Sequence, residues 1–218
     1  MGPFQNGMAY ETLVALRLST LLYKGLPINI TARGGAGNAP DIVFKSGDVQ
    51  CAIESKTCGA FEGGQVQFKL VDGVLQLPKD SLHYKIIPEY KPFNSRIPPF
   101  MEGAILKEQW NLVKEMFHDE YNQIDDLTAV AKYYREKGSF YIQIQNYGLY
   151  RTSEDDPLEF RVPLFECVCK FRTRCKTHSS TPLKKSVTCA LNYDKNTLKK
   201  SPFCIMDDAR LPNGLSLL

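Results

Sequence analysis

Pro40-Asp41-Ile42-Val43-Phe44 and Ala52-Ile53-Glu54-Ser55-Lys56 are two short apolar runs that carry charged side chains at fixed places. We expect both runs to be strands, joined by a turn at residues 46–48. Alternate residues of a strand point to the same face, so Glu54 and Lys56 are expected to lie side by side. Two carboxylates and one ammonium on adjacent strands can hold a divalent metal ion and orient a water molecule against a phosphate. The pattern therefore predicts metal-assisted hydrolysis of a phosphodiester.

Pro40-Asp41 and Glu54-Ser55-Lys56 resemble the signature of the PD-(D/E)XK nuclease superfamily, which has the restriction-endonuclease-like fold. The resemblance covers about the first third of the chain. It implies an α/β fold whose restriction-endonuclease-like core has a central mixed β-sheet flanked by helices, followed by a β-rich, basic C-terminal part. It also implies a single nuclease domain over residues 1–218. The catalytic core is expected at about 8–77, and a helical and β-rich DNA-binding part at about 101–206.

The resemblance implies that Asp41 and Glu54 bind the metal ion, with the backbone carbonyl of Ser55 as a further ligand. Oxygen ligands of this kind suit Mg²⁺, which keeps several waters, and Mn²⁺ is expected to substitute for it. Lys56 is then expected to orient or help deprotonate the attacking water, or to stabilise negative charge in the transition state. An alternative is an ordinary half-buried hairpin whose charged side chains have no catalytic role.

A helix is expected at residues 8–23, and it carries Glu11 on the same face as apolar side chains. A carboxylate on such a face has to be paired or hydrogen-bonded, because burying it alone is costly. In the superfamily that this chain resembles, a helix before the first strand often carries a Glu near the metals. Glu11 is therefore a candidate third carboxylate and metal ligand. The alternative is a partly solvated charge that favours the helix dipole.

Gln65 is a further candidate catalytic residue. In several branches of the superfamily a Gln lies just past the Glu-x-Lys motif, near the scissile phosphate, and Gln65 or Gln67 matches that place. The alternation of polar and apolar residues over 65–70 explains both glutamines equally well as the exposed face of a strand.

The remaining pattern predicts further strands and helices along the chain. The helix expected at 125–137 is followed by Gly138, a residue type that commonly ends helices. We expect strands at 26–32, 42–44, 49–56, 139–150, 165–176 and 186–193, and another helix at 103–118. The strand at 186–193 is expected to pair with the one at 165–176.

The strand at 165–176 is predicted to have a basic face. Cysteine, phenylalanine and threonine side chains alternate there with charged ones, which suits contact with phosphates. The expected nucleic-acid-binding residues are Lys170, Arg172, Arg174 and Lys176, together with Arg33 at the start of a glycine-rich loop. The alternative is a basic face that is only solvated.

Composition limits the class of protein. With 218 residues, of which 43% are hydrophobic, the chain can bury a full core. No apolar run is long enough to cross a bilayer, so no membrane association is expected. Seven scattered cysteines favour free thiols in a reducing, intracellular compartment, cytoplasmic or nuclear. The alternative for three of these cysteines, Cys167, Cys169 and Cys175, is a zinc site together with His178, with Cys189 beyond.

These observations predict a Mg²⁺-dependent endonuclease of the restriction type that hydrolyses DNA, with a homodimer left open. Two alternatives remain. One is a catalytically inactive nucleic-acid-binding protein on the same fold. The other is a structure-specific nuclease or an RNA nuclease, which the sequence does not separate from the first prediction.

Overall fold

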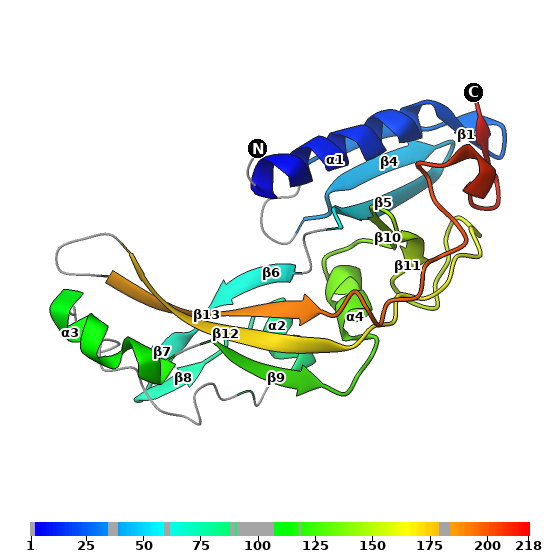
Figure 1. Cartoon of the computed structure of the whole chain (residues 1–218). Helices are drawn as coiled ribbons and strands as arrows, with labels where there is room; N and C mark the ends of the chain where they lie inside the picture. Colours follow the sequence, from blue (N-terminus) through cyan, green and yellow to red (C-terminus); the bar gives the residue numbers. More distant parts are fainter. Residues whose placement is uncertain are drawn as a thin grey trace. The chain divides into compact units, whose positions relative to one another are not determined.

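The computed structural model describes residues 3–34, 39–58, 62–87, 90, 107–117, 119–178 and 184–218. The chain divides into two compact units (Figure 1). Unit 1 consists of Met1–Phe61, Leu127–Cys167 and Asp194–Leu218, and unit 2 consists of Glu62–Asp126 and Val168–Tyr193. This division differs from the expected boundaries at about residues 77 and 101. The chain leaves unit 1 twice and returns to it twice, and local sequence carries no signal of such a path.

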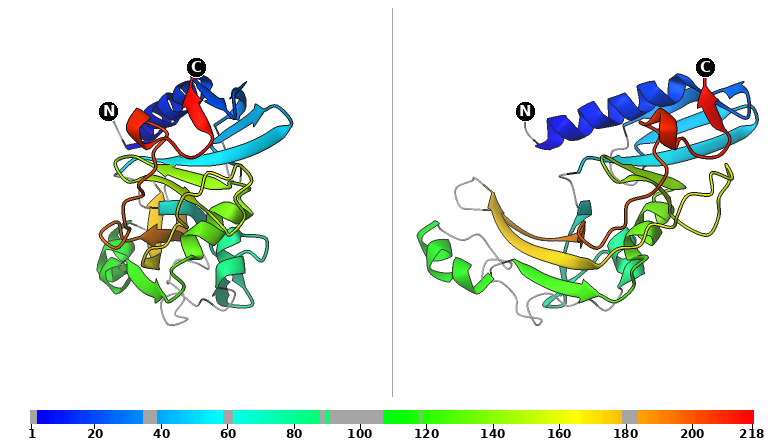
Figure 2. Two further views of the ribbon diagram at one scale, coloured as in Figure 1. Left: turned by 90° about the vertical axis from the view of Figure 1, so that its right-hand side faces the viewer. Right: turned by 45° about the vertical axis from the view of Figure 1, so that its right-hand side comes forward.

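Unit 1 contains a five-stranded mixed sheet with helix α1 (Pro3–Ser19) along one face (Figure 2). Strand β10 is parallel to β5, and the other neighbouring strands are antiparallel. Its strands, in order across the sheet, are β11 (Gly148–Arg151), β10 (Tyr141–Ile144), β5 (Val49–Lys56), β4 (Ile42–Ser46) and β3 (Asn29–Arg33). The strands expected at 42–44 and 49–56 are confirmed.

A second sheet of unit 1 explains two differences from the sequence-based expectations. It joins β14 (Leu215–Leu217), β1 (Leu21–Tyr23) and β2 (Leu26–Pro27) in that order. The helix expected to reach residue 23 ends at Ser19, because residues 21–23 pair with both β2 and β14. The single strand expected at 26–32 is divided into β2 and β3. Pairing with the C-terminus is a long-range event that local pattern does not reveal.

α1 and the five-stranded sheet share one apolar core. Side chains alternate along β4 and β5, so that one set is buried in the same core as the apolar face of α1. Complete burial of one large apolar side chain stabilises the fold by roughly 1.5–3 kcal/mol. The core includes Val14 and Leu18 from α1, Ile42 and Phe44 from β4, and Cys51 and Ile53 from β5. The opposite face of β5 is therefore left for Glu54 and Lys56.

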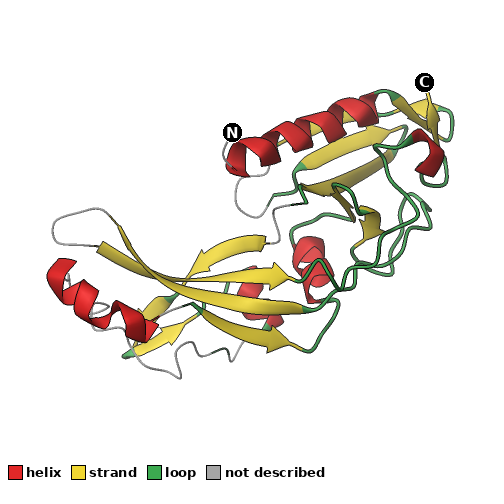
Figure 3. Cartoon of the chain, in the orientation of Figure 1, coloured by secondary structure: helices red, strands yellow, loops and turns green. Residues whose placement is uncertain are grey.

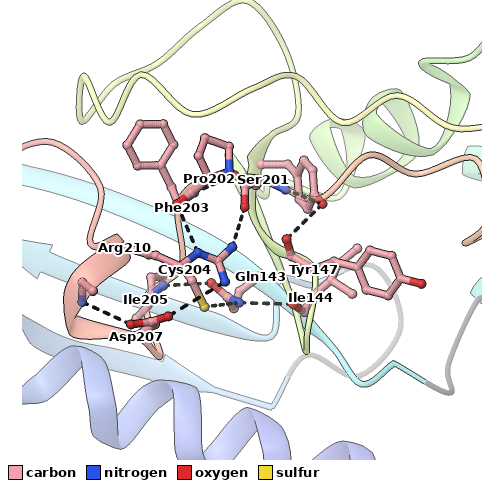
Figure 4. Close-up of polar contacts among 12 residues, drawn as sticks. Gln143, Ile144, Tyr147, Ser201, Pro202, Phe203, Cys204, Ile205, Asp207 and Arg210 are labelled. Atoms are coloured by element: carbon pink, nitrogen blue, oxygen red, sulfur yellow. Dashed lines mark hydrogen bonds and ion pairs between the residues drawn. The ribbon is translucent and has the colours of Figure 1, made fainter.

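Gln143, on β10, is buried and connects three segments of unit 1 (Figure 4). Its amide nitrogen donates to the Tyr10 hydroxyl at 3.4 Å, and its amide oxygen accepts the backbone N–H of Ile205 at 3.1 Å. These bonds join α1, the central sheet and the C-terminal segment. Tyr10 immediately precedes Glu11, so the same bonds help to fix the part of α1 that carries the candidate third carboxylate.

The C-terminal segment packs closely against the start of β11 (Figure 4). The backbone N–H of Leu149 donates to the carbonyl of Phe203 at 2.8 Å, and Arg210 Nε donates to the carbonyl of Pro202 at 3.1 Å. Gly148 has a φ of +113°, and a Cβ at this position would lie 2.3 Å from the Phe203 carbonyl oxygen. Only glycine fits this approach of two backbones.

Unit 2 contains a four-stranded antiparallel sheet (Figure 3). In order across the sheet, its strands are β6 (Glu62–Gln67), β13 (Lys184–Tyr193), β12 (Cys169–His178) and β9 (Glu120–Ile124). The other elements are the hairpin of β7 (Lys69–Val71) and β8 (Val74–Gln76), helices α2 (Leu82–Ile86) and α3 (Lys107–Val113), and the 3₁₀ turn η2 (Lys114–Phe117). α3 and η2 fall where a helix was expected at 103–118.

The paired strands β12 and β13 confirm the pairing expected between 165–176 and 186–193. Cys169, Phe171 and Thr173 are buried along β12, as the alternation predicts. The strand begins later than expected, at Cys169. Residues 165–167 belong to unit 1 instead.

The chain belongs to the α/β class, with mixed and antiparallel sheets and few helices (Figure 3). Within the described residues, no helix is both long enough and apolar enough to span a membrane. None of the seven cysteines, all of which lie in the described part of the chain, forms a disulfide.

Candidate active site

Strand pairing in unit 1 brings Asp41 and Glu54 opposite each other. Ile42, the first residue of β4, pairs with Ile53 on β5. Asp41, one residue earlier, is thereby placed across from Glu54, on the face that Glu54 shares with Lys56. The proximity predicted from the two sequence runs is confirmed.

Lys56 and the backbone of Ser55 hold the two carboxylates together. Lys56 Nζ donates to Glu54 Oε1 at 2.6 Å and lies 3.6 Å from Asp41 Oδ2. The backbone N–H of Ser55 donates to the same Asp41 oxygen at 3.0 Å. Asp41, Glu54 and Lys56 therefore form one charged cluster, in which an ammonium lies between two carboxylates.

Lys137 is a fourth member of this cluster, and the sequence did not predict it. Its Nζ lies 2.9 Å and 3.0 Å from the two carboxylate oxygens of Glu54, and 3.5 Å from Asp41 Oδ1. Lys137 directly follows helix α4 (Ala129–Glu136) and is its C-cap residue. The prediction that Gly138 ends this helix is confirmed, since Gly138 has a φ of +93°. That glycine was the only local signal near Lys137, because the contact with Glu54 joins residues 83 positions apart.

Burial makes the charges of this cluster interdependent. The Glu54 side chain is 0% exposed, and that of Lys137 is 8% exposed. Burial raises the pKa of Glu54, and so does the negative charge of Asp41, while Lys56 and Lys137 lower it. Charged groups removed from water need partners of opposite sign. Two carboxylates and two ammonium groups supply them here, with no net charge.

Tyr134, on α4, closes one side of the cluster. Its ring centroid lies 5.3 Å from Lys56 Nζ and 6.0 Å from Lys137 Nζ, within the range of cation–π attraction. Its hydroxyl is buried and has no hydrogen-bond partner among the described residues. Burial raises the pKa of Tyr134 well above its usual value, so the phenol stays neutral.

Glu11 lies in the electrostatic surroundings of the cluster. Burial raises the pKa of this half-buried residue, and the negative charge of Asp41 raises it further. Arg33, the backbone of Gly34 and Lys56 lower it. The structure therefore brings Glu11 towards Asp41 and Lys56, as expected for a third carboxylate, and its role as a metal ligand stays a prediction.

Arg33 lies beside Glu11 at the end of β3. It is exposed, and its NH2 group donates to Thr12 Oγ1 at 2.6 Å. The Arg33 guanidinium is thus attached to α1, next to the candidate third carboxylate. Contact between Arg33 and a nucleic-acid backbone stays a prediction.

The donor type of the cluster suits Mg²⁺, which prefers carboxylate oxygens. In the structure, however, these oxygens already have partners. Asp41 accepts a hydrogen bond from the Ser55 N–H, and Lys56 and Lys137 form ion pairs with the two carboxylates. Among the described residues there is no group of three or more His, Cys, Asp or Glu side chains that could hold a metal ion. A metal ion held by both carboxylates would take over oxygens that the ammonium groups now contact. The Ser55 carbonyl as a ligand stays a prediction.

Gln65 lies in unit 2, on β6, and its Nε2 donates to Thr188 Oγ1 on β13 at 2.8 Å. This bond gives Gln65 a role in holding the sheet of unit 2 together. Its catalytic role stays a prediction.

The basic face of β12 carries partners that the sequence did not reveal. Arg172 forms an ion pair with Glu62 on β6. Arg174 Nε contacts both carboxylate oxygens of Asp119, at 2.8 Å and 3.0 Å. Two of the expected phosphate-binding arginines are therefore already paired with carboxylates.

Lys170 and Lys176 complete the expected basic face. Lys170 Nζ lies 4.8 Å from the ring centroid of Tyr121, an exposed residue of β9. The side chain of Lys176 lies outside the described residues. Lys170 and Tyr121 thus place a cation and an aromatic ring side by side in unit 2.

Comparison with known proteins assigns no function to this chain. No family model, no curated protein and no solved structure matches this chain. A function for this chain therefore has to be inferred from the chemistry of Asp41, Glu54, Lys56 and Lys137.

Proposed function

We propose that unit 1 is the catalytic core of a Mg²⁺-dependent endonuclease that hydrolyses phosphodiester bonds of DNA, of the restriction type. The observation that carries the proposal is the convergence of Asp41, Glu54 and Lys56, in which Lys56 Nζ lies 2.6 Å from one carboxylate and 3.6 Å from the other. Carboxylates that can hold a divalent ion, next to an ammonium, are the groups that phosphodiester hydrolysis requires.

Each member of the cluster has a role in this proposal. Asp41 and Glu54 hold the metal ion, with the Ser55 carbonyl and Glu11 as further ligands. The bound metal supplies Lewis-acid chemistry and lowers the pKa of a coordinated water. Lys56 orients the attacking water and stabilises negative charge that develops on the phosphate. Mn²⁺ substitutes for Mg²⁺, since both accept oxygen ligands.

The fold of unit 1 supports a restriction-endonuclease-like core. The mixed sheet of β3, β4, β5, β10 and β11 carries α1 on one face, and α4 and its C-cap residue supply Tyr134 and Lys137 to the charged cluster beside β5. This arrangement is compatible with the central mixed sheet flanked by helices that the resemblance implies.

The charge of the β12–β13 hairpin supports DNA as the substrate. Residues 168–193 include six Lys or Arg and no Asp or Glu. A concentration of positive charge of this kind attracts the phosphate backbone. Carboxylates from other segments of unit 2 pair with Arg172 and Arg174, whereas Lys170 lies beside the ring of Tyr121.

A second candidate function is favoured by one observation. Lys137 contacts both carboxylates and leaves the cluster without net charge. A cluster in which two lysines neutralise Asp41 and Glu54 is also compatible with a catalytically inactive nucleic-acid-binding protein on the same fold.

Incubation with supercoiled plasmid, single-stranded DNA and RNA, each with Mg²⁺, Mn²⁺ or EDTA, separates these functions. We expect cleavage of plasmid with either metal and none with EDTA, and mapping of the ends then gives the cut position. Preferred cleavage of RNA, or of branched DNA, would replace the restriction-type function by one of the other nuclease functions. Binding of DNA without cleavage of any substrate would support the inactive protein.

A further inference from the structure

Lys137 donates hydrogen bonds to both carboxylate oxygens of Glu54. Its Nζ lies 2.9 Å and 3.0 Å from these oxygens and 3.5 Å from Asp41 Oδ1. Lys56 donates to Glu54 Oε1 at 2.6 Å and lies 3.6 Å from Asp41 Oδ2. The Lys137 ammonium thus bridges the two carboxylates, as a cation shared by both would.

The backbone that carries Lys137 is fixed by several bonds. The Lys137 N–H donates to the carbonyl of Tyr133 at 3.1 Å, and the Gly138 N–H donates to that of Arg135 at 2.9 Å. Next, the Ser139 N–H donates to the carbonyl of Tyr134 at 3.0 Å, as the chain turns towards β10. The position of Lys137 beside Glu54 is therefore a feature of how α4 joins the sheet.

The charge of the cluster opposes the entry of a divalent ion while both lysines remain in place. Asp41, Glu54, Lys56 and Lys137 together carry no net charge, so a divalent ion would add two uncompensated positive charges at a buried position. Like charges a few ångströms apart in a partly buried site repel strongly. The cluster can accept the metal favourably only if one ammonium leaves the carboxylates.

We propose that Lys137 is a positioning residue of the candidate active site, whose ammonium holds Asp41 and Glu54 in place of the metal ion and is displaced when the metal binds. This inference rests on the proposed function, because it takes the two carboxylates as the metal ligands. It explains how a fully buried Glu54 keeps its geometry before metal arrives. It also makes metal affinity depend on Lys137, although an ammonium is itself no ligand.

The test is titration of the folded protein with Mg²⁺ alone by isothermal calorimetry, without DNA. Lys137→Met keeps most of the side-chain length and removes the charge. We expect this variant to bind Mg²⁺ at least about tenfold more tightly than the unsubstituted protein, which corresponds to about 1.4 kcal/mol. Lys132→Met is the matched control, because Lys132 is an exposed lysine of the same helix. We expect the control to change the affinity less than about twofold.

Thermal unfolding supplies a second measurement, the shift in melting temperature that Mg²⁺ causes. This shift distinguishes the proposed role of Lys137 from a purely structural one. Without metal, Lys137→Met should melt at a lower temperature, because it leaves Glu54 with one fewer counter-ion. Added Mg²⁺ should then raise the melting temperature of this variant more than that of the unsubstituted protein. A lysine with only a structural role would lower the melting temperature and leave the metal-induced shift unchanged.

Lys137→Gln serves where Lys137→Met does not fold, since an amide still donates a hydrogen bond to Glu54 but carries no charge. A folded variant of either kind whose Mg²⁺ affinity is equal to or weaker than that of the unsubstituted protein overturns the inference. The test of Lys137 and the test of nuclease activity can fail independently of each other. Tighter metal binding without nuclease activity would support the role of Lys137 and reject the nuclease, whereas cleavage together with unchanged metal affinity would reject only the role of Lys137.

Discussion

At the scale of single residues, Glu54 is the centre on which the candidate site depends. Its side chain is fully buried, and two ammonium groups and the neighbouring Asp41 surround it. A buried ion is stable only while its partners are present, so removal of one member affects the others. The sequence predicted Asp41, Glu54 and Lys56 because alternation along a strand is a local rule. It did not predict Lys137, whose position depends on how a distant helix returns to the sheet.

Glu11 gives the first prediction at this scale. Burial raises its pKa, and the negative charge of Asp41 raises it further. Glu11→Gln should lower the rate of Mg²⁺-dependent cleavage by about tenfold or more, since an amide is a weaker metal ligand than a carboxylate. The free energy of unfolding should change by less than about 0.5 kcal/mol, because the residue is half-exposed and glutamine fills the same space. An unchanged cleavage rate would make Glu11 a helix-start charge only.

At the scale of secondary-structure elements, the local sequence pattern predicts whether a segment is a helix or a strand. Pairing with other strands decides where that element begins and ends. β4, β5 and the β12–β13 pair follow from alternation and were predicted. β1 was expected to be part of a helix, because one of its two partner strands, β14, comes from the far C-terminal part of the sequence. The acidic partners of Arg172 and Arg174 were missed for the same reason, since Glu62 and Asp119 come from other segments.

The start of β11 gives a prediction at the element scale. Gly148→Ala should destabilise unit 1 by roughly 2–4 kcal/mol, because a side chain at positive φ is strained and its Cβ would overlap the Phe203 carbonyl. Gly7→Ala is the matched control, since Gly7 lies in α1 with open space around its Cβ. The control should be neutral or stabilise by up to about 1 kcal/mol. Urea unfolding measures both, and equal stabilities of the two variants would contradict this description of the C-terminal segment.

The basic face of β12 gives a second prediction at this scale. Replacing Arg172 and Arg174 by Ala should weaken DNA binding with little regard to sequence, and flatten the dependence of log K on log salt by about 0.9 per phosphate contact removed. Lys170→Ala, which breaks no ion pair with a carboxylate among the residues that the structure describes, provides the comparison. If the double variant loses stability while its salt slope is unchanged, the two arginines serve only their ion pairs with Glu62 and Asp119.

At the scale of the whole molecule, the two units have separate cores and different chemistry. Unit 1 holds the charged cluster, and unit 2 holds the basic hairpin and an aromatic core that includes Phe68, Tyr90 and Phe171. The sequence predicted the cluster of Asp41, Glu54 and Lys56 and the basic strand, but not the aromatic core. It did not predict the boundaries, because nothing in the local pattern marks which of several consecutive strands share a sheet.

His83, buried in unit 2, gives a prediction about pH. Burial lowers its pKa to about 4 from an ordinary value of 6.5. The unfolded chain therefore takes up a proton below about pH 6.5 that the folded protein does not accept until about pH 4. Stability contributed by neutral His83 is complete above pH 6.5 and falls as the pH falls, by roughly 2–3 kcal/mol at pH 4. His83→Phe should remove this part of the pH dependence in urea unfolding between pH 7 and pH 4, and an identical pH dependence in the variant would contradict it.

The central claim is that Asp41 and Glu54 hold the metal ion of a nuclease, and one comparison tests it most directly. Supercoiled plasmid is incubated with Mg²⁺ and either the unsubstituted protein or Glu54→Gln, which keeps the shape of the side chain and removes its charge. We expect the unsubstituted protein to nick or linearise the plasmid, and the variant to cleave at least about a hundredfold more slowly. DNA affinity should remain within about twofold, because the side chain of Glu54 is fully buried. Cleavage by Glu54→Gln at near the unsubstituted rate would contradict the assignment of the active site.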